Sequence, residues 1–309
     1  MPRARPKKRG WFGRIVFWTT GAAFLFVAVS LLWVLLYRFI NPPYTFTMAG
    51  DTLGGRTVTR DWMDLGDMDR DMVRAVVAAE DSKFCAHRGF DQDAIAAAMR
   101  RNARGGSVIR GGSTISQQTA KNAFLWQGGG YFRKGLEAWF TLLIENIWGK
   151  RRIMEVYLNI AETGIGTYGA NAGAQRYFNH DASTMSRTEA ARIAAVLPLP
   201  KERGAVAPKG FTRRYGNAIA ARIGAVARDG LDACVYTGAA PARDKPEPPA
   251  SPKRKAAPKA APAPSAPIPG DEYETARPAE EAPASEPQPE PAPASEPEPA
   301  PEAPEPTGL

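Results

Sequence analysis

The segment AAEDSKFCAHRGFD, residues 78–91, ends a run of small apolar residues with two adjacent carboxylates, Glu80 and Asp81. The apolar residues before this segment recur at the spacing of one helix face. They are Met72, Val73, Val76 and Val77. The pattern predicts a helix over residues 70–81 whose last turn inserts into a wall of the protein core.

A carboxylate at the end of such a helix is desolvated on one side. Desolvation raises the pKa of a carboxyl group such as Glu80, and an acid that titrates near neutral pH suits a general base. A surface Glu–Asp pair at a helix end is the alternative. His87 either belongs to the same site or packs against a loop. The sequence has only two histidines and no HExxH or CxxC motif, so it offers no zinc site.

Helical spacing and capping residues predict further helices. These are DQDAIAAAMRRNARGG (91–106) with Asp91 as the cap, STISQQTAKNAF (113–124) with Ser113 or Thr114 as the cap, YFRKGLEAWFTLLIENIW (131–148), KRRIMEVYLNIAE (150–162), and SRTEAARIAAVLPLP (186–200) with a Ser186–Glu189 capping box. GGRTVTR (54–60) is the best strand signal. Glycine-rich loops are expected at 104–113, 126–131 and 162–173, where close backbone approach to a ligand is permitted.

The N-terminal region predicts a membrane anchor. Residues 15–37 carry no charge, and at 1.5 Å per residue they are about 35 Å long, enough for a hydrocarbon core of about 30 Å. A cleavable signal peptide has a shorter apolar region and a small-residue cleavage site, which is missing here. Residues 1–14 hold six Lys and Arg residues, so the positive-inside rule places them in the cytoplasm and the rest of the chain outside.

The remaining chain divides into a domain and a tail. Residues 41–237 suffice for one basic domain, which suits an anionic partner at the membrane surface rather than nucleic acid. Residues 239–309 are rich in Ala, Pro and Glu and are expected to be disordered, either as a spacer or as a binding arm. Cys85 and Cys234 fall outside the membrane, where a disulfide persists; a disulfide and two buried thiols both remain open.

Two more polar groups are site candidates. Arg133 and Glu137 are four residues apart and share a helix face, as a surface ion pair or as part of a site. Gln117, Gln118, Lys121 and Asn122 lie on one short predicted helix, where amides and an ammonium suit sugar hydroxyls and phosphate; a plain polar face is the alternative. Phe124, Leu125 and Trp126 either dip into the bilayer or pack in the core.

The order of five segments narrows these alternatives. EDSKFCAHRG (80–89), GGSTISQQTAKN (111–122), RKGLE (133–137), KRRIMEVYLN (150–159) and RIAAVL (192–197) resemble the five consecutive motifs of the peptidoglycan glycosyltransferases, glycosyltransferase family 51. The resemblance covers about residues 69–200. The anchor and the size are similar to those of monofunctional members, and no SxxK or KTG motif of a transpeptidase half is present.

The resemblance implies a mostly α, lysozyme-like fold with a small membrane-proximal jaw subdomain. It implies an enzyme of the bacterial inner membrane with a periplasmic catalytic domain, whose substrates are lipid II and the growing glycan chain. The C4 hydroxyl of one lipid II attacks C1 of the chain, with inversion and release of undecaprenyl pyrophosphate. Cell-wall elongation or division proteins are the candidate protein partners. The rival functions are a lysozyme-like or lytic transglycosylase acting on finished glycan, and a non-enzymatic envelope scaffold.

The resemblance also assigns site residues. Glu80 matches the general base, Asp81 supports it, and Phe84 and His87 shape the turn that aims it. Glu137 matches the second essential glutamate, which organises the leaving pyrophosphate through the protein's cations or through a divalent metal, Mg or Mn. The remaining matched positions are Lys121 and Arg133 beside the pyrophosphate, Ser113, Thr114, Gln118 and Asn122 along the cleft, and Lys134 nearby.

Overall fold

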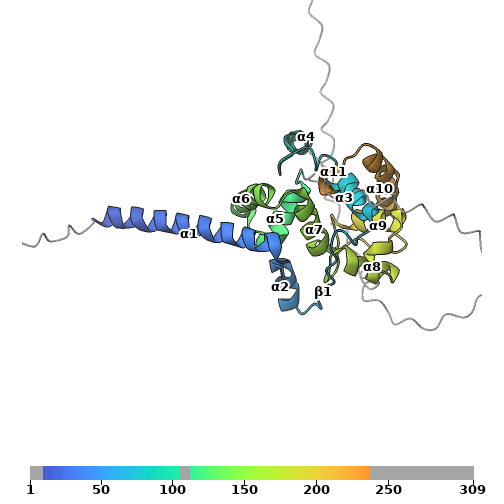
Figure 1. Cartoon of the computed structure of the whole chain (residues 1–309), viewed down its shortest axis with the longest axis horizontal. Helices are drawn as coiled ribbons and strands as arrows, with labels where there is room; N and C mark the ends of the chain where they lie inside the picture. The colour runs from blue at the N-terminus through green and yellow to red at the C-terminus, as the bar shows by residue number, and fades with distance from the viewer. Residues whose placement is uncertain (1–9, 105–111, 237–309) are drawn as a thin grey trace, which may run out of the picture. The chain divides into compact units, whose positions relative to one another are not determined.

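The computed structural model describes residues 10–104 and 112–236, and Figure 1 shows their elements in chain order. The predicted tail (239–309) and the basic segment up to residue 9 lie outside the described residues. The elements are α1 (Trp11–Phe39), α2 (Phe46–Leu53), β1 (Thr59–Arg60), α3 (Arg70–Glu80), α4 (Gln92–Ala103), α5 (Ile115–Phe124), α6 (Gly130–Ile147), α7 (Lys150–Ile160), β2 (Glu162–Gly164), β3 (Thr167–Tyr168), α8 (Ala170–Phe178), the 3-10 helix η1 (Ala182–Thr184), α9 (Arg187–Val196), α10 (Gly210–Arg228) and α11 (Ala233–Tyr236). The prediction of a mostly α fold is confirmed.

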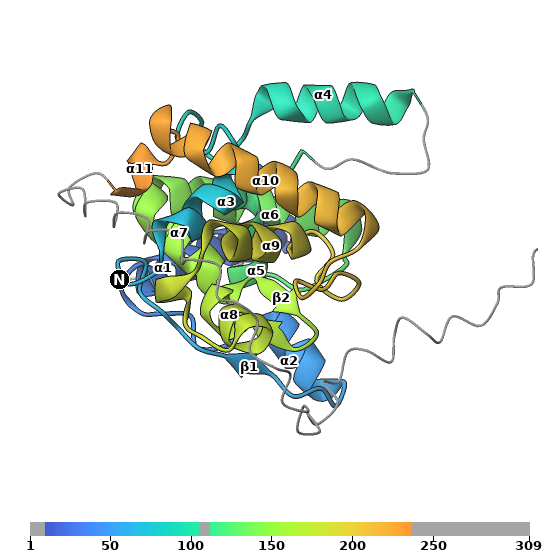
Figure 2. The same cartoon turned by 90° about the vertical axis from the view of Figure 1, so that its right-hand side faces the viewer.

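The core lies where α3 and α5 meet the helices that follow them in sequence. α3 packs against α9 and α10, and α5 packs against α6 and α7. Figure 2 shows α10 running across α3 and α9. α3 is buried from Met72 through Ala78, so it enters the core along nearly its whole length. Its C-terminal residue is therefore held at a fixed place beside α5.

The strands form one small sheet in the order β1-β3-β2, with β1 parallel and β2 antiparallel to β3. The predicted strand near residue 57 is confirmed as β1. The prediction of a loop over residues 162–173 is wrong in part, because these residues include β2, β3 and the start of α8. The turn between β2 and β3 depends on Gly166, whose φ is +66° and whose added Cβ would lie 2.3 Å from the Thr57 carbonyl oxygen.

Within the described residues, α1 is the one helix long and apolar enough to cross a membrane. Its C-terminal half is attached to the domain by side-chain hydrogen bonds. Trp139 donates to the Ser30 hydroxyl at 3.1 Å, Trp148 to the Val34 carbonyl at 2.7 Å, and Arg152 to the Tyr37 carbonyl at 3.0 Å. Apolar side chains before this region are exposed, as expected of a segment that contacts lipid. The helix is thus compatible with the predicted anchor.

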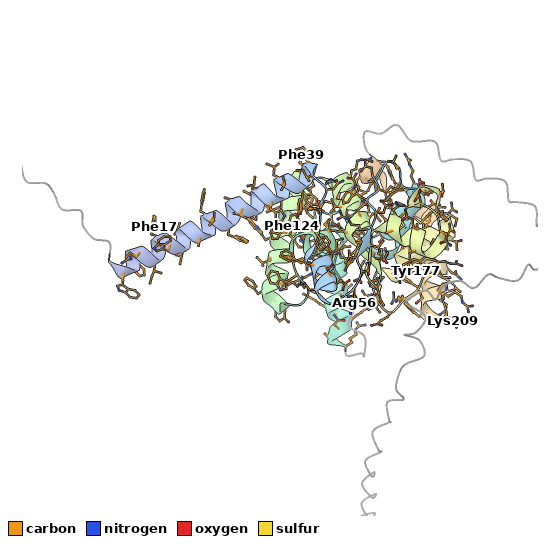
Figure 3. All side chains as sticks on the ribbon, turned by 90° about the horizontal axis from the view of Figure 1, so that it is seen from below. Phe17, Phe39, Arg56, Phe124, Tyr177 and Lys209 are labelled. Carbon is orange, nitrogen blue, oxygen red and sulfur yellow. A yellow bond between two sulfur atoms is a disulfide. The ribbon has the colours of Figure 1, made fainter. Side chains whose placement is uncertain are left out.

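An aromatic cluster fills the junction between α1, α5 and α6. Phe124, labelled in Figure 3, stacks on Phe140 with ring centroids 4.7 Å apart and on Tyr37 at 5.5 Å. Phe124 and Leu125 are each only 2% exposed, whereas Trp126 is 40% exposed. The bilayer alternative is therefore wrong for Phe124 and Leu125, which pack in the core.

A disulfide joins Cys85 to Cys234, with their Cα atoms 5.4 Å apart. It ties the turn that follows α3 to α11 at the end of the domain. The alternative of two buried free thiols is therefore wrong.

Candidate active site

Glu80 is the last residue of α3, and its carboxylate is half-buried beside α5. The Asp69 carboxylate caps the start of α3 by accepting from the Asp71 amide. At the other end, the Gln118 amide donates to Glu80 Oε2 at 3.0 Å. Burial raises the pKa of the Glu80 carboxyl, while the Gln118 hydrogen bond and the Arg203 charge oppose that shift. A carboxylate that is poorly solvated and oriented by one amide is suited to accept a proton.

Two tyrosines complete the surroundings of Glu80. The Tyr157 hydroxyl donates to Gln118 Oε1 at 3.3 Å, which directs the Gln118 NH2 group toward Glu80. The Tyr215 hydroxyl donates to the Ala79 carbonyl at 2.8 Å and fixes the last turn of α3. Neither tyrosine nor Arg203 was predicted. Tyr157 lies in KRRIMEVYLN, one of the five motif segments, so the resemblance could have marked it as a site residue. No motif or local pattern marks Tyr215 or Arg203.

The residues after Glu80 form a hydrogen-bonded turn. Asp81 is buried and accepts from the Ile115 amide and from His87 Nε2, both at 3.0 Å. His87 Nδ1 accepts from the Gly89 amide at 3.1 Å, so the ring proton is assigned to Nε2. Phe84 is 0% exposed. These contacts join α3 to the start of α5.

Asp81, Phe84 and His87 pack and bond within the turn beside Glu80. Phe84 has no exposed surface, and the polar atoms of Asp81 and His87 are engaged with the protein itself. Their position agrees with the expectation that they support Glu80 and shape this turn. Lys150 lies over the Phe84 ring, 4.4 Å from its centroid, and a cation at that distance stabilises the ring position further.

The second acid, Glu137, is 3% exposed on α6. Arg133 donates to its Oε2 at 2.8 Å and Lys134 donates to its Oε1. Lys134 also reaches the exposed Ser113 hydroxyl at 3.3 Å. Burial lowers the pKa of the nearby Lys121 ammonium, an effect that the Glu137 charge opposes and the two other cations reinforce. The surface ion-pair alternative is wrong, because this carboxylate is buried among three cations.

Helix α5 joins the two acids. Thr114 caps it through a capping box with Gln117, and the Thr114 hydroxyl also donates to the Gly89 carbonyl at 2.7 Å. Gln118 and Lys121 are three residues apart and therefore lie on one face of the helix. Gln118 contacts Glu80, and Lys121 lies in the field of Glu137. Asn122 is half-buried on the same face, four residues after Gln118.

The donor groups at Glu137 do not fit a resident metal ion. Both of its oxygens are already bonded to cations. Within residues 10–104 and 112–236, no group of three or more His, Cys, Asp or Glu side chains could hold a metal. Two surface cavities, of about 330 and 390 Å³, are lined by other residues, and neither includes a predicted site residue.

Comparison with known proteins identifies the family. Residues 48–223 match the family model described as Transglycosylase. The chain is 50% identical over 209 residues to a biosynthetic peptidoglycan transglycosylase of Caulobacter vibrioides, covering 68% of this chain and 91% of the relative. It is 48% identical over 219 residues to the protein of that name from Xanthomonas campestris pv. campestris, covering 69% and 88%. The corresponding protein of Rhodospirillum centenum is 47% identical over 216 residues, covering 70% and 91%. The chain therefore belongs to the transglycosylase family.

Proposed function

We propose that this chain is a peptidoglycan glycosyltransferase that polymerises lipid II into glycan strands. The observation that carries the proposal is the pairing of a desolvated carboxylate, Glu80, with a buried acid–cation cluster around Glu137, both held by α5. A base and an anion-binding cluster about one turn apart along one helix face suit the transfer of a sugar from a diphosphate to a hydroxyl.

In the proposed reaction, Glu80 accepts the proton of the C4 hydroxyl of the incoming lipid II. The C4 oxygen bonds to C1 of the growing chain while the bond from C1 to the pyrophosphate oxygen breaks. The electron pair of that bond leaves with undecaprenyl pyrophosphate. Attack from the Glu80 side and departure on the other side invert C1.

The cations around Glu137 supply the electrostatic part of catalysis. Lys121, Arg133 and Lys134 stabilise negative charge on the leaving diphosphate, a contribution that is often the largest in such sites. Glu137 holds Arg133 and Lys134 in fixed positions through its two oxygens. The protein provides these charges itself, and no step of the proposed mechanism is assigned to a metal.

The location supports the same function. The basic residues before α1 favour a cytoplasmic N-terminus by the positive-inside rule. The Cys85–Cys234 disulfide requires an oxidising compartment, which is outside the cytoplasm. The catalytic domain is thus proposed to lie at the outer face of the inner membrane, where lipid II and the glycan chain are its partners. Cell-wall elongation or division proteins remain proposed partners without a structural assignment.

The test is gel analysis of products from labelled lipid II with the full-length protein in detergent. Wild type should give glycan polymer, and Glu80→Gln should give none while still binding lipid II. Glu162→Gln is the matched control, because burial also raises the pKa of Glu162, which lies on β2 outside the site; it should retain activity. Shortening of finished glycan strands without polymer from lipid II would favour the lytic alternative. Failure of wild type on both substrates would favour a scaffold.

A further inference from the structure

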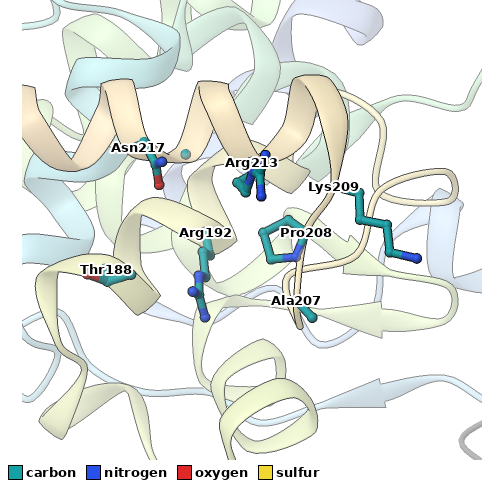
Figure 4. Close-up of a pocket in the computed structure, with 8 residues that line it drawn as sticks. Thr188, Arg192, Ala207, Pro208, Lys209, Arg213 and Asn217 are labelled. Atoms are coloured by element: carbon teal, nitrogen blue, oxygen red, sulfur yellow. The ribbon is translucent and has the colours of Figure 1, made fainter.

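A basic pocket lies between α9 and the start of α10, outside the site described above. Its volume is about 330 Å³, near the lower end of the range for small-ligand sites. Figure 4 shows Arg192 on α9, Arg213 on α10, and the segment from Ala207 to Lys209 along one side. None of the residues assigned to lipid II lines this pocket.

The charge of the pocket is unbalanced. Arg192, Lys209 and Arg213 line it, and no carboxylate does so among the described residues. In the part of the chain that the structure covers, none of these three side chains forms an ion pair or a hydrogen bond to a protein group, unlike Arg74, Arg133 and Arg152 elsewhere in the domain. Like charges gathered around a hollow repel one another, and a bound anion removes that repulsion.

The start of α10 lies beside the pocket, because Pro208 and the N-cap residue Lys209 line it. α10 is 19 residues long, and the positive end of its dipole favours an anion nearby. The Asn217 amide and the Thr188 hydroxyl line the same hollow and can also donate. Ala207 has a φ of +44°, a conformation that costs energy for a residue with a side chain and that shapes the pocket wall.

We propose that this pocket binds a phosphoryl group. Arg192 on α9 and Arg213 on α10 line the pocket from two helices, and guanidinium groups bind phosphate oxygens through charge-assisted hydrogen bonds. The small volume suits the head of a ligand rather than a whole glycan. The source is either a soluble phosphate ester or an anionic phospholipid headgroup, and the two are separated by experiment.

The first experiment measures binding of inorganic phosphate to the full-length protein by ³¹P NMR titration in detergent at constant ionic strength. We expect saturable binding to wild type and a dissociation constant at least tenfold higher in the Arg192→Gln/Arg213→Gln variant. Arg214→Gln is the matched control, since it removes the same charge from the next position of α10 but does not line the pocket; it should change the constant less than twofold. Equal binding by all three proteins, or none by wild type, would overturn the proposal.

The second experiment identifies the source. The protein is placed in nanodiscs of phosphatidylcholine or of phosphatidylglycerol, and the phosphate titration is repeated. If phosphatidylglycerol weakens binding of added phosphate in wild type, the ligand is a lipid headgroup; equal binding in both lipids assigns a soluble phosphate ester. Neither measurement requires glycan synthesis, so failure of this proposal and failure of the proposed function are distinguishable.

Discussion

Loss of the Cys85–Cys234 disulfide should destabilise the domain strongly. The two cysteines are 149 residues apart in sequence, so the bridge closes a loop of about 150 residues, for which the chain-entropy model gives about 5 kcal/mol at 25 °C. The whole of α5, α6 and α7 lies within that loop. We therefore expect the double variant Cys85→Ser/Cys234→Ser to lose between about 2 and 5 kcal/mol of unfolding free energy, the range measured for native disulfides.

The assay is urea denaturation of the full-length protein in detergent, followed by near-ultraviolet circular dichroism. Dithiothreitol should lower the midpoint of wild type to that of the double variant and leave the variant unchanged. The single variant Cys85→Ser should match the double variant, because either substitution removes the bridge. Identical midpoints for oxidised and reduced wild type, with thiol titration confirming reduction, would refute the reasoning that this bridge constrains the unfolded chain.

Three further substitutions test other features. Glu137→Gln leaves its paired cations without a carboxylate and should cost about 1.5–3 kcal/mol by denaturation, whereas an unchanged midpoint would count against a structural pairing. Burial raises the pKa of the Glu80 carboxyl above its usual 4.5, so the folded state holds this proton more tightly than the unfolded chain does. The free energy of unfolding therefore falls as pH rises from 4.5 through the raised value. Glu80→Gln should stabilise the protein more at pH 8 than at pH 4, and equal effects at both pH values would contradict the desolvation. At Gly89, φ is +88° and an added Cβ would lie 2.7 Å from Thr141 Cγ2, so Gly89→Ala should cost about 2–4 kcal/mol for conformation and overlap together. Gly55→Ala is its control, because Gly55 has φ +77° and no atom lies within 4 Å of an added Cβ. This variant should lose only the conformational part of the unfolding free energy, about 1–2 kcal/mol. Thermal melts measure both glycine variants.

The sequence predicted α3, α4, α5 and α9 from a cap or an apolar stripe, and α6 and α7 from the apolar stripe alone, since neither has a side-chain cap. α3, α4, α5 and α9 begin at Asp69, Asp91, Thr114 and Ser186, each of which accepts a hydrogen bond from a backbone amide in the first turn. α8 was missed because it is built mainly from small residues, whereas α10 was missed although Phe211, Tyr215, Ile219 and Ile223 recur at helical spacing. In α8 those small residues are needed for close packing, since a Cβ on Gly173 would lie 2.9 Å from Thr163 Oγ1.

The site was only partly predictable from its residues. Local sequence indicates that an acid ends an apolar helix, and Glu80 is indeed desolvated there. The resemblance placed Gln118 along the cleft, but its contact with Glu80, 38 residues away in sequence, was not predicted, because no local pattern specifies such a pairing. Arg203 and Tyr215 come from the region after the last motif, so their approach to α3 depends on how α10 folds back. That fold-back is a property of tertiary packing, which single-sequence patterns do not encode.

The placement of Gln118 and Lys121 on one helix links the two halves of the site mechanically. Gln118 contacts Glu80, and Lys121 lies near Glu137; the two positions are three residues apart, about 4.5 Å along the helix axis. Because both belong to α5, any movement of that helix displaces the group that orients the Glu80 carboxylate and the cation near Glu137 together.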